Sequence, residues 1–251
     1  MIILIDILDN DFIKRLINAK KIGPETMLKE FEKMNEEALK KAFHGTTTTG
    51  IVCKDGVVLA TDKRATSGSF IASKTVNKIY RLGNHLASTM AGRVADSQSI
   101  MDVIRAEVAL FEIEYERPMP IKAAATLMAN ILFSSRFFPY YIQTIVAGVD
   151  NEGSHAFNLD LLGSIIREDY ICTGSGSPIA YAILEENYHE DITVEEALSV
   201  LIRAVNAAMN RDSASGDGFN AVKITKEEGY QELSTEDIEK VIKKFIKKKE
   251  K

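Results

Sequence analysis

The feature that most constrains the fold is a change in hydrophobic spacing at Gly45. Over residues 27–42, apolar side chains recur every three or four positions, which is the spacing of one helical stripe. After Gly45 the period becomes two, and residues 46–62 read as a strand, an Asp55-Gly56 turn and a second strand. The chain therefore changes at this point from a helical arm to β-structure.

Beyond the first hairpin, groups of strands alternate with groups of helices. A second hairpin is predicted around Gly83-Asn84, and residues 166–174 predict a single further strand. Helices are predicted over 94–116, 121–136, 178–188, 194–210 and from 235. This order is typical of a layered α+β domain, not of alternating βαβ units. We expect a helical arm over 1–45 and one domain over 46–251.

Composition excludes several classes of function. The formal charge of −5 argues against nucleic-acid binding, which needs a clustered basic face. The apolar start MIILIDIL is too short to cross a membrane and lacks the flanks of a secretory signal. Cys53 and Cys172 lie far apart, and the four histidines show no ligand spacing, so no disulfide framework or metal site is expected. A reducing cytoplasm is the expected location.

The run HGTTTTG at 44–50 has two interpretations. β-branched residues suit the start of a strand. Cleavage before Thr46, however, would put a hydroxyl and a free α-amine on one residue. Such an amine has a pKa of about 7.7–8, which suits a general base near neutral pH. Threonine activated by its own amine is a recognised nucleophile, whereas an amide nitrogen in mid-chain is not basic.

Five stretches favour the second interpretation. They occur in this order over roughly residues 45–235: GTTTTGIVCKDGVVLATDKRATSG, VNKIYRL, STMAGRVADSQ, CTGSGSPIAY and NRDSASGDG. Together they closely resemble the β subunits of the proteasome core particle, of the archaeal kind. The resemblance implies the N-terminal nucleophile hydrolase fold, a four-layer αββα sandwich of two antiparallel sheets between helices.

The resemblance also implies roles for particular residues. Thr46 matches the family's nucleophile, and Gly45 matches the residue before the autolytic cut. Lys78 in VNKIY matches the catalytic lysine, whose ammonium favours the ionised hydroxyl. Asp62 in ATDKR matches the acid that pairs with this lysine and keeps it charged.

Four further positions match the family's catalytic groups. Gly92 in MAGR matches the glycine whose backbone N–H forms the oxyanion hole. Ser175, Asp212 and Ser215 match the polar group around the amine of the nucleophile. The implied reaction is attack on a peptide carbonyl, an acyl-enzyme ester and its hydrolysis, with no metal or organic cofactor.

The family's first specificity pocket maps onto uncharged positions, which implies a chymotrypsin-like preference for cleavage after apolar or aromatic residues. These positions are Ala65, Val76, Tyr80, Met90 and Val94, with Gln98 nearer the rim.

The resemblance further implies partners. Seven β subunits form a ring, two rings stack, α-subunit rings cap the ends, and a regulatory ATPase delivers unfolded chains. Two alternatives stay open: the bacterial two-ring threonine peptidase, and a structural ring subunit that never matures. The first shares the TT start and the lysine, but GSGSP and RDSASG look more like the proteasome. The second usually lacks the threonine, the lysine or the preceding glycine, all of which are present here.

One departure from the family pattern is the 45-residue arm, because archaeal members often have short propeptides. We expect a helical arm that covers the active-site side of the sheets and protects Thr46 until rings assemble. Thr49 stands where the family commonly has valine, which a strand tolerates.

Overall fold

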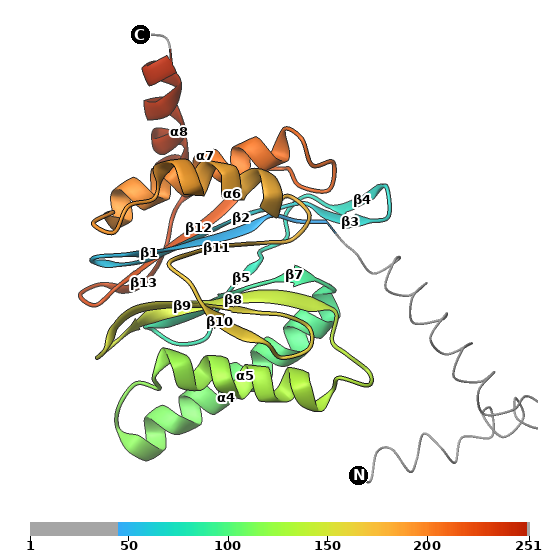
Figure 1. The fold of residues 1–251 in the computed structure, drawn as a ribbon, viewed down its shortest axis with the longest axis vertical. Helices are drawn as coiled ribbons and strands as arrows, with labels where there is room; N and C mark the ends of the chain where they lie inside the picture. The colour runs from blue at the N-terminus through green and yellow to red at the C-terminus, as the bar shows by residue number, and fades with distance from the viewer. Residues whose placement is uncertain (1–44, 250–251) are drawn as a thin grey trace, which may run out of the picture. The chain divides into compact units, whose positions relative to one another are not determined.

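The computed structural model describes residues 45–249, with side chains to residue 243. The described part is a sandwich of two antiparallel sheets between two layers of helices (Figure 1). The predicted α+β class and its four layers are therefore confirmed. The predicted helices of the arm lie outside the described residues.

The first sheet carries the residues that follow Gly45. Its strand order is β11-β1-β2-β12-β13, with every neighbouring pair antiparallel. The strands are β1 (Thr48–Cys53), β2 (Gly56–Asp62), β11 (Tyr170–Thr173), β12 (Phe219–Thr225) and β13 (Gly229–Glu232).

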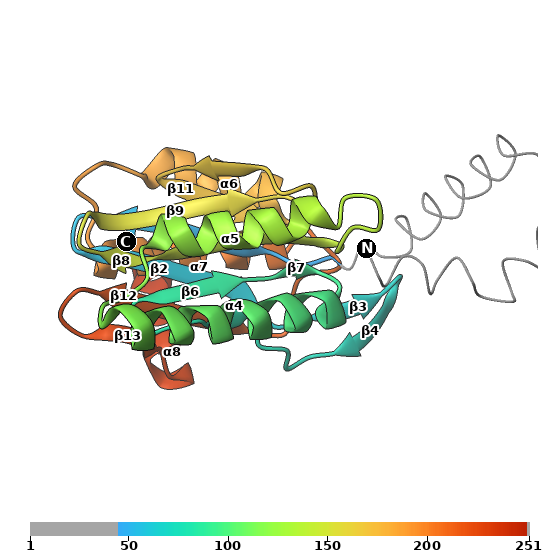
Figure 2. The ribbon, with the colours of Figure 1, turned by 90° about the horizontal axis from the view of Figure 1, so that it is seen from below.

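The second sheet has the order β10-β9-β8-β6-β5, and the short β7 pairs with β8. Its strands are β5 (Ile79–Arg81), β6 (Leu86–Thr89), β7 (Ala91–Gly92), β8 (Ile142–Asp150), β9 (Gly153–Leu159) and β10 (Ile165–Arg167). A separate hairpin, β3 (Ala65–Ser67) and β4 (Phe70–Ser73), projects at the end of the sandwich where β1 begins (Figure 2). The sequence interpretation did not predict this hairpin.

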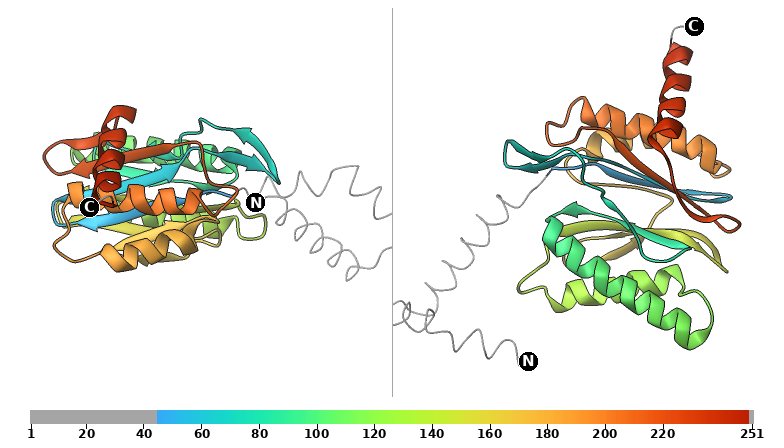
Figure 3. Two further views of the ribbon diagram at one scale, coloured as in Figure 1. Left: turned by 90° about the horizontal axis from the view of Figure 1, so that it is seen from above. Right: turned by 180° about the vertical axis from the view of Figure 1, so that it is seen from behind.

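Helices cover the outer face of each sheet. The layer on the first sheet holds α6 (Ser177–Asn187) and α7 (Val194–Met209), and the layer on the second holds α4 (Val94–Tyr115) and α5 (Ile121–Ser134). A last helix, α8 (Thr235–Lys249), packs its first turns against α7 and projects from that layer (Figure 3). The start of α7 is fixed by a capping box, in which the Thr193 side chain accepts from the Glu196 N–H and Glu196 bonds back to Thr193.

Strand alternation explains why the sandwich has three apolar layers. In β2, Val57 and Leu59 face the other sheet, whereas Val58 and Ala60 face α6 and α7. All four are buried, as a strand covered on both faces requires.

The predicted strand over 166–174 is wrong in one respect, because the structure divides this segment between the two sheets. The Glu168 N–H donates to the carbonyl of Ala156 on β9, and the next carbonyl, of Asp169, accepts from the Val52 N–H on β1. The chain therefore crosses from β10 to β11 within these two acidic residues.

Candidate active site

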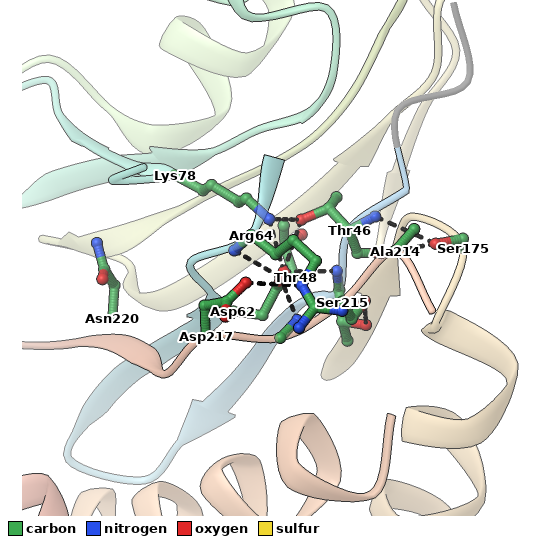
Figure 4. A network of polar contacts seen from close by, with 12 residues as sticks. Thr46, Thr48, Asp62, Arg64, Lys78, Ser175, Ala214, Ser215, Asp217 and Asn220 are labelled. Atoms are coloured by element: carbon green, nitrogen blue, oxygen red, sulfur yellow. Dashed lines mark hydrogen bonds and ion pairs between the residues drawn. The ribbon is translucent and has the colours of Figure 1, made fainter. Parts of the chain in front are cut away.

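Three of the predicted residues are in mutual contact beside the start of β1. The Thr46 hydroxyl donates to Asp62 Oδ1 at 2.7 Å, and Lys78 Nζ donates to the same oxygen at 2.7 Å (Figure 4). Lys78 Nζ also donates to Thr46 Oγ1. All three side chains are buried, with Asp62 fully inaccessible to solvent. Thr46 precedes β1, Asp62 ends β2 and Lys78 precedes β5, so both sheets contribute to the cluster.

Asp62 is the anchor of this cluster because it accepts three further hydrogen bonds from the backbone. The Thr47 N–H donates to Oδ1 at 2.9 Å. The N–H groups of Arg64 and Gly216 donate to Oδ2 at 3.0 and 2.9 Å. Asp62 therefore ties the loop after β2 and the loop before β12 to one buried carboxylate.

Burial and charge act on Lys78 in opposite directions. Burial lowers the pKa of its ammonium from the ordinary value, and the nearby Asp62 carboxylate partly opposes this shift. A lysine whose pKa is lowered in this way is a stronger proton donor than one in water. It lies in contact with the hydroxyl that the sequence predicts as the nucleophile.

A second polar cluster surrounds the Thr46 nitrogen, which in the described chain is a peptide amide. The Thr46 N–H donates to Ser175 Oγ at 3.1 Å. Asp212 Oδ2 accepts from both Ser175 Oγ at 2.5 Å and Ser215 Oγ at 2.6 Å. Ser215 Oγ is also 2.7 Å from Thr47 Oγ1. The structure thus brings the three predicted residues together on one side of Thr46.

Close packing requires glycine at two predicted positions. A Cβ on Gly45 would overlap the Cβ of Ala214 and lie 2.7 Å from Ser175 Oγ. Gly92 has φ +128°, which disfavours other residues, and a Cβ there would overlap the carbonyl oxygen of Tyr141. Gly92 lies in β7, at the edge of the same hollow as Thr46.

That hollow is a cavity of about 320 Å³ beside Thr46. Four of the six predicted pocket residues line it, namely Ala65, Val76, Met90 and Val94. The other two do not. The Tyr80 hydroxyl lies 3.2 Å from Met90 Sδ, but Tyr80 lines a separate hollow. Gln98 is exposed one turn further along α4.

Several residues of the site were missed by the sequence interpretation. Arg64 Nε pairs with Asp217 Oδ2 at 2.7 Å, and this pair ties the β2–β3 loop to the loop before β12. Thr47, which precedes β1, bonds to both polar clusters: its N–H donates to Asp62 and its hydroxyl contacts Ser215 Oγ. It therefore does more than open a strand. Arg93 lines the cavity. The only sequence signal for the pair of Arg64 and Asp217 was the glycine-rich segment that follows Asp212.

The described residues hold no group of three or more metal-ligating side chains. None of the helices in this region is both long and apolar enough to span a membrane. What the cluster offers instead is a hydroxyl between a carboxylate and an ammonium, beside a cavity with one apolar wall. Such an arrangement suits nucleophilic attack by the hydroxyl.

The sandwich of two antiparallel sheets between helical layers is the architecture of the N-terminal nucleophile hydrolases. The model of the family described as "Proteasome subunit" matches residues 42–224. A relative in Archaeoglobus profundus, "Proteasome subunit beta", is 52% identical over 82% of this chain and 96% of its own length. A relative with the same name in Ferroglobus placidus is 51% identical over 82% of this chain and 98% of its own length. Another, in Methanothermobacter thermautotrophicus, is 48% identical over 81% of this chain and 97% of its own length.

The chain therefore belongs to the proteasome subunit family, as a member of the β type. Membership makes it a subunit of a protease of the proteasome kind. It also confirms the resemblance and favours the proteasome over the bacterial two-ring peptidase.

Proposed function

We propose that the chain is a threonine endopeptidase whose nucleophile is the hydroxyl of Thr46, freed by removal of the arm. The observation that carries the proposal is the convergence of Lys78 Nζ and Asp62 Oδ1 on Thr46 Oγ1. A threonine that merely opened a strand would not need a buried ion pair at its hydroxyl. Because burying such a pair is costly, its presence argues for chemistry at this point.

We assign one group of the site to each step of peptide hydrolysis. The freed Thr46 amine, beside Ser175, accepts the hydroxyl proton directly or through water, and the oxygen attacks the substrate carbonyl carbon. The Gly92 N–H stabilises the oxyanion, and Lys78 stabilises the developing charge on Oγ1. The peptide C–N bond breaks, the leaving amine takes the proton, and an ester on Thr46 remains. Water hydrolyses this ester and restores the hydroxyl.

Removal of the arm uses the same hydroxyl. Thr46 Oγ1 attacks the Gly45 carbonyl, the Gly45–Thr46 bond breaks, and the proton ends on the new amine of Thr46. Water then releases residues 1–45 with a free carboxylate, and 46–251 is the mature domain. Tight packing of Gly45 against Ala214 and Ser175 supports this, since it holds the bond beside the hydroxyl.

The cavity supports a chymotrypsin-like preference. Ala65, Val76, Met90 and Val94 form an uncharged wall that suits an apolar or aromatic side chain. Such a wall discriminates by about 1–3 kcal/mol per methylene. Tyr80 supports the wall from behind Met90, and Gln98 acts at most on a longer substrate.

We further propose assembly into heptameric β rings, stacked in pairs and capped by α-subunit rings, with a regulatory ATPase feeding unfolded polypeptides. The relatives' names as proteasome β subunits support this assembly. Cys53 and Cys172 are free and buried, in accord with a cytoplasmic location.

The test is hydrolysis of a leucyl coumarin peptide by the chain co-expressed with its α subunit, comparing wild type, Thr46→Ala and Thr126→Ala. Thr126 lies on the exposed face of α5, so its variant is a matched control. We expect Thr46→Ala to lose activity to background and Thr126→Ala to retain it. Activity that survived in Thr46→Ala would refute the mechanism. An inactive wild type that keeps its arm would instead favour the non-maturing structural subunit.

A further inference from the structure

Three cations line the cavity beside Thr46, and among its described lining residues there is no acid. Two of the cations are already neutralised. Lys78 pairs with Asp62, and Arg64 pairs with Asp217 and also donates to the Ser213 carbonyl at 2.8 Å. The third, Arg93, has no carboxylate partner within the described part of the chain. The apolar wall therefore has a cationic border.

The backbone and the ring beneath it fix the place of Arg93. It is the N-cap residue of α4 and directly follows Gly92, and its N–H donates to the Tyr141 carbonyl at 2.9 Å. Its guanidinium lies over the Tyr141 ring, with Cζ 4.5 Å from the ring centroid. The Tyr141 N–H is held in turn by Asp96 Oδ2 at 2.9 Å.

Arg93 is only partly buried, and its guanidinium has no hydrogen-bond acceptor among the described residues. A cation–π contact uses the face of the group, whereas its five N–H donors lie in the plane. A planar edge of this kind matches a carboxylate, which it can bind through two parallel hydrogen bonds. No described residue supplies that carboxylate, so a substrate side chain can.

We propose that Arg93 is a specificity residue, selecting substrates with a glutamate or aspartate among the residues that precede the cleaved one. The proposal rests on the proposed function, because it assumes that the apolar wall holds the residue whose carbonyl Thr46 attacks. The enzyme then cleaves after an apolar residue, and cleaves fastest where an acidic residue lies shortly before it. A purely apolar pocket predicts no such preference.

The test uses the assembled, processed enzyme and coumarin tripeptides that end in leucine. Ala-Glu-Leu and Glu-Ala-Leu are compared with their glutamine counterparts and with Ala-Ala-Leu. An ion pair near the surface predicts a roughly two- to fivefold higher kcat/KM for at least one glutamate peptide over its glutamine isostere. This ratio should shrink as salt is added.

Substitutions then assign the preference to Arg93. In Arg93→Gln the ratio should fall to about one, and Arg93→Glu should favour lysine peptides instead. Arg105→Gln is the matched control, since Arg105 also lies on the α4 side of the sandwich but lines other hollows and pairs with Asp102. It should keep the wild-type ratio.

The outcomes separate this inference from the proposed function. If wild type does not cleave Ala-Ala-Leu, or Thr46→Ala does, the proposed function fails. If wild type cleaves Ala-Ala-Leu but shows no glutamate preference, or the preference persists in Arg93→Gln, only the role of Arg93 is refuted.

Discussion

Replacing Asp62 with asparagine should damage both the stability and the maturation of the chain. The carboxylate is fully buried and accepts five hydrogen bonds, three at Oδ1 and two at Oδ2. An asparagine NH2 in place of Oδ2 would point a donor at the N–H groups of Arg64 and Gly216. Placed at Oδ1, it would face Lys78. Neither orientation satisfies the surrounding donors.

The larger cost comes from the charge that is left behind. Lys78 is buried and would lose the carboxylate that raises its pKa, so its pKa would fall further below the ordinary value. Breaking a buried ion pair by removing one partner costs about 3–5 kcal/mol. We expect the free energy of unfolding to drop by about that amount, and the arm to remain attached.

Asp217→Asn is the matched control. Asp217 pairs with Arg64, but its side chain is partly exposed, and asparagine tolerates its φ of +64°. A partly exposed pair contributes under about 1 kcal/mol. Urea unfolding of the full-length chain expressed alone gives both values, and intact mass after co-expression with the α subunit gives the maturation state. A loss in Asp62→Asn no greater than that of the control, with normal maturation, would refute the assignment of Asp62 as the anchor.

Two further predictions follow from packing and burial. Gly45→Ala should slow removal of the arm by roughly 5- to 150-fold, since overlap of the new methyl group with Ala214 costs about 1–3 kcal/mol. A time course of intact mass measures the rate of removal. An unchanged rate would contradict the argument that close packing requires glycine at this position. Burial raises the pKa of Cys53 to about 12 and also raises that of Cys172, so at pH 8 both are protonated thiols. Iodoacetamide should label neither in the native enzyme and both in denaturant; inhibition of native activity would implicate a thiol.

Local signals predicted much of the fold. Both predicted hairpins are present: the Gly83-Asn84 turn lies between β5 and β6 as expected, whereas the turn between β1 and β2 is Lys54-Asp55, one residue before the predicted Asp55-Gly56. The crossing between the two sheets at Glu168 and Asp169 was not predicted, because no pattern in the sequence around these residues indicates that the chain changes sheets there. That crossing depends on backbone partners in β9 and β1, which are distant in sequence.

The site was predicted by resemblance more than by pattern. An isolated lysine such as Lys78 is unremarkable in the sequence, and only its contact with Thr46 sets it apart. Arg64 and Asp217 are separated by more than 150 positions, so no local spacing could pair them. The cationic border of the cavity was missed for a related reason. Arg93 adjoins Gly92 in sequence, but its free edge depends on Tyr141, which stacks on it from another element.

Whether Thr46 is the nucleophile can be read from the intact mass of the chain purified after co-expression with its α subunit. We expect a wild-type chain that begins at Thr46 and a Thr46→Ala chain that keeps residues 1–45. A mature wild-type chain that began at any other residue, or loss of the arm in Thr46→Ala, would contradict the assignment of Thr46 as the nucleophile.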